Sequence, residues 1–160
     1  MAKQYRVSAF VRINNSIISS LLHLGVKLGS FALLRVRGRK SGKPIETPIA
    51  IFVQEGKSYL LTPYGIVNWV RNLRAAGGEA TITRTRRTEK IHAVELPPEA
   101  AAPIFREAVC SGPPGIPAVL IQVYRSFFVL PYLNITVDSS LEEYEREVLT
   151  HPVFLVQSAM

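Results

Sequence analysis

Apolar and polar residues follow two different periods along the chain, and the first of these is helical. Between about Val7 and Leu24, apolar side chains recur at the three- and four-residue spacing of a helix, and Gly25 ends the stretch. The pattern predicts an amphipathic N-terminal helix within residues 1–28. This amphipathic pattern favours a helix whose apolar face packs on the hydrophobic core of the protein. Cationic residues flank it, so peripheral contact with a membrane surface is the alternative.

The pattern then changes to short apolar runs separated by turns, as expected for strands. Strands are predicted at Phe31–Arg37, Ile45–Gln54 and Ser58–Thr62, a short helix at Asn68–Ala76 with Asn68 as N-cap, and a hairpin of Glu79–Arg84 with Thr88–Leu96. Residues 31–96 are therefore expected to hold the main sheet or barrel together with one inserted helix.

Residues 97–160 return to mostly helical spacing. A helix is predicted from Pro97 toward Cys110, and a helical stretch at 118–128, with a strand as the alternative there. Ser140 is expected to begin a further helix by forming a capping box with Glu143, and a closing strand is predicted at 153–157. With no repeat or linker, 160 residues suit one domain. The order of elements predicts an α+β fold around an antiparallel sheet or barrel.

Composition narrows the class of ligand but does not choose it. Nineteen Lys and Arg against twelve Asp and Glu give a formal charge of +7, which favours a polyanionic partner. Nucleic acid is not expected, because the chain carries no recognisable motif for it. One cysteine and three scattered histidines predict no metal site. The N-terminal stretch lacks a signal-peptide core, so we expect a cytoplasmic protein.

Cationic side chains are most concentrated in the turn after the first predicted strand. Five cationic side chains fall within residues 35–43, together with two glycines and a serine. Backbone N–H groups and cations can converge on an anion in such a turn, whereas the alternative is a solvated basic hairpin. It is not a Walker A loop, because only three residues separate Gly38 from Gly42 and Pro44 replaces the magnesium-binding hydroxyl.

A second cluster follows the third predicted strand. Thr62-Pro63-Tyr64-Gly65 leads into a short helix on which Asn68 and Asn72 share a face and Trp69 lies on another. Such residues can line a planar ligand pocket, although burial of Trp69 in the core is favoured over stacking on a ligand. Tyr64, Tyr124 and Tyr132 are candidate proton donors, and no catalytic residue is identified. No hydrolytic triad or carboxylate pair is evident.

Together these segments resemble the deazaflavin-dependent nitroreductases, also called flavin/deazaflavin oxidoreductases. The resemblance rests on Gly38-Arg39-Lys40-Ser41-Gly42-Lys43-Pro44, on Thr47-Pro48, and on the Trp69-x-x-Asn72-Leu-x-Ala motif, in family order and spacing. His151-Pro152-Val153-Phe154 also resembles the family. Ile45 departs from it, because several relatives carry arginine there.

The resemblance implies a split β-barrel that binds coenzyme F420, with FMN as the alternative, and that passes a hydride from the reduced deazaflavin to a quinone, nitro compound or enone. A non-catalytic FMN- or lipid-binding protein at a membrane surface is the alternative function, and a homodimer is implied. The expected cofactor-binding residues are Arg37, Gly38, Arg39, Lys40, Ser41, Gly42, Lys43, Pro44, Thr47, Pro48, Thr62, Pro63, Tyr64, Gly65, Asn68, Trp69 and Asn72.

Overall fold

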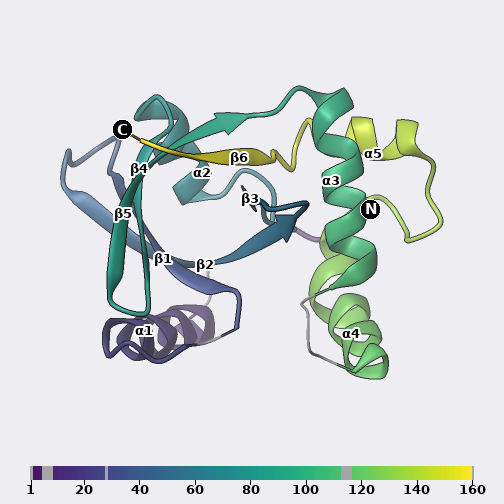
Figure 1. The fold of residues 1–160 in the computed structure, drawn as a ribbon. Helices are drawn as coiled ribbons and strands as arrows, with labels where there is room; N and C mark the ends of the chain where they lie inside the picture. Colours follow the sequence, from purple (N-terminus) through teal and green to yellow (C-terminus); the bar gives the residue numbers. More distant parts are fainter. Residues whose placement is uncertain (1, 5–8, 28, 113–116, 160) are drawn as a thin grey trace. The chain divides into compact units, whose positions relative to one another are not determined.

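The computed structural model describes residues 2–4, 9–27, 29–112 and 117–159 (Figure 1). Contacts group them into two compact units. The barrel unit takes its described residues from 6–60, 67–94 and 155–160, and the helical unit from 1–5, 61–66 and 95–154. That the chain folds as one domain stays a prediction.

Strands of the barrel unit, within the described residues, close into a barrel in the order β1-β2-β3-β6-β5-β4. They are β1 (Phe31–Arg37), β2 (Pro44–Gln54), β3 (Lys57–Leu60), β4 (Glu79–Arg84), β5 (Arg87–Glu95) and β6 (Phe154–Ser158), and the helices of this unit are α1 (Ala9–His23) and α2 (Asn68–Ala75). β1 pairs antiparallel with β2 and β4, β2 with β3, and β4 with β5. The predicted split β-barrel with flanking helices is confirmed.

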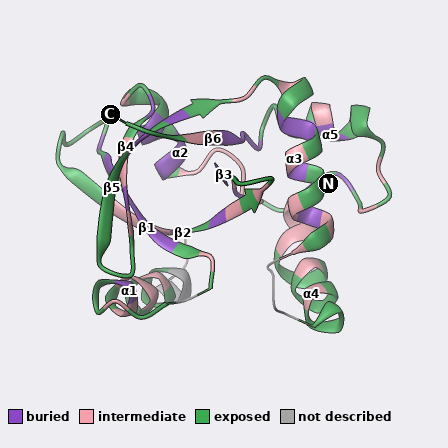
Figure 2. Cartoon of the chain, viewed as in Figure 1, coloured by how far each residue is buried: buried purple, intermediate pink, exposed green. Residues whose placement is uncertain are grey.

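The barrel core is built around β1, which lies between β2 and β4. Most of β1 is buried (Figure 2). Leu34 of β1 pairs with Ile82 of β4, and both side chains are almost completely buried. Helix α1 contacts β1 and β2 and contributes the buried Leu22. The predicted N-terminal helix is thus confirmed over Ala9–His23, while its expected start at Val7 lies outside the described residues.

Glycine is required where α2 turns into β4. Gly77 and Gly78 have φ angles of +64° and +85°, and a Cβ atom at Gly78 would overlap the Ala93 carbonyl oxygen. The predicted stop of the helix at these glycines is confirmed. The expectation that Asn68 caps α2 is wrong, because Asn68 is the first helical residue and Val67 precedes it without a side-chain cap.

The helical unit contains α3 (Pro98–Ser111), α4 (Ala118–Tyr124) and α5 (Leu141–Glu147). A π-helical turn at Arg125–Val129 and a 3₁₀ turn at Leu130–Tyr132 follow α4, so the predicted helical stretch at 118–128 is confirmed. The predicted capping box at Ser140 and Glu143 is also present, and its hydrogen bonds lower the pKa of Glu143. Within the described part of the chain, none of the helices has both the length and the hydropathy to cross a bilayer.

Residues Glu55 and Gly56 make the two-residue turn between β2 and β3, with φ angles of 51° and 74°. A non-glycine residue strains at positive φ by about 1–2 kcal/mol, and asparagine tolerates this conformation better than most residues. We therefore expect Glu55→Asn, which creates the favoured Asn-Gly turn, to raise the free energy of unfolding by about 0.5–1 kcal/mol in urea titrations.

Glu55→Gln is the matched control, because it removes the same charge without the same backbone preference. Equal stabilities of the two variants would contradict the strain at this turn.

Candidate anion-binding site

The turn between β1 and β2 is held by its own backbone. Gly38 N donates to the Lys43 carbonyl oxygen at 2.8 Å, and Gly42 N donates to the Gly38 carbonyl oxygen at 2.8 Å. The Ser41 hydroxyl accepts from Lys43 N at 3.2 Å, and Gly42 has a φ angle of +69°. A Cβ atom at Gly38 would come within 2.7 Å of the Ile45 side chain and 2.8 Å of the Ser41 hydroxyl, so both side chains would have to shift to admit a larger residue.

Two N–H groups of this turn are left for a ligand. Among the residues that the structure describes, Lys40 N and Ser41 N have no hydrogen-bond acceptor. The side chains of Arg37, Lys40 and Lys43 likewise have no hydrogen-bond or ion-pair partner in that part of the chain. Consecutive N–H groups beside free cations form a concavity suited to an anion. The basic turn therefore has the chemistry of an anion-binding site.

Helix α2 connects the second predicted cluster to this turn. The Asn72 carboxamide oxygen accepts from Arg39 N at 3.3 Å and from Arg39 Nη1 at 2.8 Å, while Asn72 itself is only 3% exposed. The Asn68 carboxamide oxygen lies 3.5 Å from Arg39 Nη2, at the limit of a hydrogen bond. Trp69 is buried, as expected for a core anchor. Two motifs that are separate in sequence thus meet at Arg39.

A groove of about 1140 Å³ opens beside the turn, within the barrel unit. The turn forms one wall, the end of α2 at Ala75 and Ala76 another, and strands β1, β4 and β5 the floor. Register places Arg35, Thr81 and Lys90 side by side on three neighbouring strands of that floor. Glu79 is the acidic residue among the lining residues. The charged residues that line the groove are therefore mostly cationic, and the groove extends beyond the turn.

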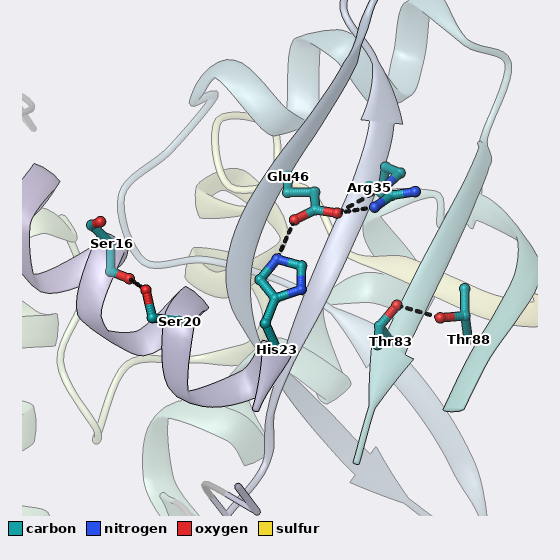
Figure 3. Close-up of polar contacts among 7 residues, drawn as sticks. All are labelled: Ser16, Ser20, His23, Arg35, Glu46, Thr83 and Thr88. Atoms are coloured by element: carbon teal, nitrogen blue, oxygen red, sulfur yellow. Dashed lines mark hydrogen bonds and ion pairs between the residues drawn. The ribbon is translucent and has the colours of Figure 1, made fainter. Parts of the chain in front are cut away.

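Arg35 differs from the other cations because it is paired. Its guanidinium binds Glu46 on β2, with Nε 2.8 Å from Oε1, and His23 Nε2 of α1 lies 2.7 Å from Glu46 Oε2 (Figure 3). Burial raises the pKa of Glu46, but the hydrogen bonds from Arg35 and His23 outweigh that effect and lower the pKa overall. This carboxylate is therefore ionised at neutral pH and ties α1 to the barrel.

Several expected site residues lie outside the groove. Thr47 and Pro48 pair with Leu34 and Leu33 of β1, and like Lys43 they do not line the groove. Residues 62–65 belong to the helical unit and are described there. The groove residues Thr81, Lys90 and His92 were missed by the sequence analysis. The alternation of polar residues along the β4–β5 hairpin is the signal that could have shown them.

In the helical unit, Tyr64 and Tyr132 meet with ring centroids 5.0 Å apart and planes at 89°. Tyr124 stacks on Phe128 at 5.5 Å, and burial raises the pKa of its hydroxyl although the residue is 46% exposed. The Tyr124 phenol is therefore protonated at neutral pH.

A buried polar pair in the helical unit was also missed by the sequence analysis. His151 Nδ1 lies 3.3 Å from Glu147 Oε1, and both residues are 6% exposed. A Cβ atom at Gly65 would lie 3.8 Å from His151 Nε2, so the turn at 62–65 packs on this histidine. The one available signal was the four-residue spacing of Glu147 and His151 near the His151-Pro152 motif.

Charge is divided unequally between the two units. The barrel unit carries 15 of the 19 Lys and Arg residues and 4 of the 12 Asp and Glu residues, so the helical unit is net acidic. The positive surplus of the whole chain therefore lies on the unit that holds the groove. A closed barrel with a cationic groove and a glycine turn rich in free N–H groups defines a barrel protein that binds a polyanionic ligand.

Comparison with known proteins identifies the family. Residues 6–121 match the family described as F420H(2)-dependent quinone reductase, and the chain belongs to it. It is an F420-dependent reductase with coenzyme F420 as its cofactor, which confirms the resemblance, the enzyme class and the cofactor predicted from the sequence. No curated protein matches the chain.

Solved structures show weaker likenesses. The F420-H2 dependent reductase FDR-A is 20% identical over 82% of this chain and 97% of its own, with a TM-score of 0.48. A domain-swapped dimer is 19% identical over 94% and 100%, also at 0.48. A putative 5-nitroimidazole antibiotic resistance protein from Bacteroides thetaiotaomicron is 11% identical over 88% and 80%, at 0.38. Because these scores are below 0.5, the family match alone carries the identification.

The two hydrogen bonds from Arg39 to Asn72 should contribute to the stability of the fold. Asn72→Leu keeps the size of a buried side chain but removes the acceptor of two partly buried hydrogen bonds from Arg39. Leaving such donors unsatisfied should lower the free energy of unfolding by about 1–3 kcal/mol, measured by urea denaturation.

Asn68→Leu is the matched control on the same helix, because Asn68 is exposed and its contact with Arg39 is long. We expect less than about 0.5 kcal/mol for this surface change. A similar loss for both variants would show that the hydrogen bonds between Asn72 and Arg39 do not account for the change in the free energy of unfolding.

Proposed function

We propose that the groove at the β1–β2 turn holds the phosphate and the oligoglutamate tail of reduced F420, and that the enzyme passes a hydride to a quinone. The observation that carries this proposal is the pair of free N–H groups at Lys40 and Ser41 beside unpaired cations. A phosphate needs such donors, and the cations along the groove suit a chain of carboxylates. The residues present therefore fit the anionic half of the cofactor.

Individual residues would have different tasks in binding. Lys40 would supply a mobile charge to the phosphate, and Arg37, which lies over Gly42, would contact the same anion. Arg39 is held by Asn72 and would present its remaining guanidinium donors in a fixed direction. Lys90 on β5 would meet carboxylates farther along the groove. The bound cofactor supplies the hydride, and the protein supplies position and electrostatics.

The remaining expected residues would serve the ring and the acceptor. The turn at Thr62, Pro63, Tyr64 and Gly65 would line the ring site, as the family resemblance implies. Reduction of a quinone to a hydroquinone needs one hydride and one proton. A tyrosine hydroxyl at Tyr64 or Tyr132, which share one aromatic contact, would donate that proton to the acceptor oxygen. Nitro compounds and enones are the other proposed acceptors, and a homodimer stays a prediction.

Cofactor binding can be measured by the fluorescence of F420 titrated with purified protein. Lys40→Glu replaces an attractive charge by a repulsive one, so we expect the Kd to rise about ten- to a hundredfold at low salt, and the ratio of the two Kd values to fall as salt screens the charges.

Lys57→Glu is the matched control, since Lys57 begins β3 and does not line the groove. It makes the same charge change and should leave the Kd within about twofold, because Lys57 does not line the groove and salt screens exposed charges that do not contact the ligand. Wild-type protein that fails to bind F420 at tens of micromolar, or two variants that bind equally weakly, would rule out this groove as the cofactor site.

The acceptor and the proton donor can be tested in one anaerobic assay of reduced F420 consumption with a quinone, a nitroaromatic and an enone. Tyr64→Phe or Tyr132→Phe should lower kcat for the quinone at least about tenfold while F420 binding is unchanged, because only the proton donor is removed. Tyr124→Phe is the comparison variant. Preference for the nitroaromatic or the enone over the quinone would overturn the proposed acceptor.

A further inference from the structure

Two short segments of the helical unit bring their tyrosines together. Tyr64 lies in the turn at 62–65, and Tyr132 ends the 3₁₀ turn at Leu130–Tyr132. Their rings meet edge to face with centroids 5.0 Å apart. A tight turn and a single turn of 3₁₀ helix have few backbone hydrogen bonds of their own. Contacts with the rest of the helical unit must therefore fix where the two tyrosines lie.

The carboxylate of Glu147, at the end of α5, holds the segment that follows Tyr132. Asn134 N donates to Glu147 Oε1 at 3.1 Å, and Glu147 is only 6% exposed. Burying a carboxylate is costly unless hydrogen bonds satisfy it. The contacts of Glu147 are therefore the reason to examine what this buried group does.

The same carboxylate oxygen also faces His151. Nδ1 of His151 lies 3.3 Å from Glu147 Oε1, 3.3 Å from the Glu147 carbonyl oxygen and 3.0 Å from Thr150 Oγ1. The Thr150 hydroxyl donates its own hydrogen to the Glu147 carbonyl oxygen at 3.1 Å, so its oxygen is left to accept. Each polar neighbour of Nδ1 is thus an acceptor, and Nδ1 carries a proton.

The opposite nitrogen of this imidazole faces the turn that holds Tyr64. Gly65 has a φ angle of +78°, and a Cβ atom there would lie 3.8 Å from His151 Nε2 and 3.4 Å from the Thr150 carbonyl oxygen. Phe105 packs on the ring, with centroids 6.0 Å apart. Because the hydrogen bonds of Nδ1 orient the ring, they also set the surface on which the turn lies.

We propose that the Glu147–His151 pair positions Tyr64 and Tyr132 for proton donation. One carboxylate oxygen binds both the segment after Tyr132 and the histidine beside the turn of Tyr64, so a single buried group sets how the two tyrosines meet. Glu147 and His151 are positioning residues, because they act through the tyrosines. The inference rests on the proposed function, in which one of these hydroxyls gives its proton to the quinone.

Substitutions of Glu147 separate its hydrogen bonds from its charge. Glu147→Leu removes the acceptor of both bonds, whereas Glu147→Gln keeps an oxygen that can accept both. We expect Glu147→Leu to lower kcat for the quinone about tenfold and to leave the Kd for F420 within about twofold, and Glu147→Gln to keep kcat within about twofold.

Two further variants complete this set. Glu142→Leu removes the same charge from an 81% exposed side chain of α5 and should behave like the wild type. His151→Phe keeps a ring beside Phe105 but lacks the donor, and it should lower kcat as Glu147→Leu does. It provides the test if Glu147→Leu does not fold.

Coupling to the tyrosines distinguishes positioning from a general effect on the fold. In a chain that already carries whichever of Tyr64→Phe and Tyr132→Phe lowers kcat, His151→Phe should cause no more than about a twofold further loss, because the hydroxyl through which it acts is gone. A residue that only stabilises the fold would add its full effect in that chain.

Amide hydrogen exchange tests the positioning without F420 or an acceptor. Tyr64 N donates to Thr62 Oγ1 at 3.2 Å, and its exchange reports how firmly the turn is held. We expect this exchange to be about tenfold faster in Glu147→Leu and His151→Phe than in the wild type or Glu147→Gln. Faster exchange in an enzyme whose kcat needs neither tyrosine would refute the proposed proton donor while confirming that the pair holds the turn.

Unchanged exchange at Tyr64 in both Glu147→Leu and His151→Phe would overturn the proposal, because the turn would then be held without the pair. Equal losses of kcat in Glu147→Gln and Glu147→Leu would also overturn it, since the charge rather than the hydrogen bonds would then be responsible. A full additional loss from His151→Phe in the tyrosine variant would show that the pair does not act through that hydroxyl.

Discussion

The partly buried hydrogen bonds between Asn72 and Arg39 are the constraint on which the candidate anion-binding site depends. They join two segments that lie 33 residues apart, and they use the backbone N–H of Arg39 together with its guanidinium. With that N–H occupied, and with Gly38 and Gly42 bonded within the turn, the free donors are confined to Lys40 and Ser41. A helix that has its own core anchor in Trp69 thereby sets the direction in which a glycine turn presents its N–H groups.

Across the barrel unit, too, some charged groups are paired within the chain and others are left without a partner among the described residues. Arg35 is neutralised by Glu46, and the pair serves the attachment of α1. Arg37, Lys40 and Lys90 have no such partner within the described residues, so their mutual repulsion is relieved only by an anion from solution. Unpaired cations that gather in a groove oppose folding slightly and favour a polyanionic ligand strongly. The family's cofactor supplies a physical reason for that arrangement.

Two kinds of polar interaction thus have separate roles in this small enzyme. Satisfied groups, such as those of Asn72 and of the buried Glu147–His151 pair, hold turns in place. The unpaired N–H groups of Lys40 and Ser41 at the β1–β2 turn are available to a partner from outside the chain. The barrel unit therefore fixes its turn with satisfied groups and leaves unpaired donors and cations along a groove on its β1, β4 and β5 strands.

Local sequence determined the elements, because the spacing of apolar residues and the positions of glycine act within a few residues. It placed β1 and β4 at their observed bounds and predicted the basic turn, the capping box at Ser140 and the stop at Gly77. Tertiary structure alone decided that Asn72 binds Arg39, that Lys90 lies beside Thr81 and Arg35, and that His151 supports Gly65. These contacts depend on strand register and helix packing between distant segments, which no local period encodes.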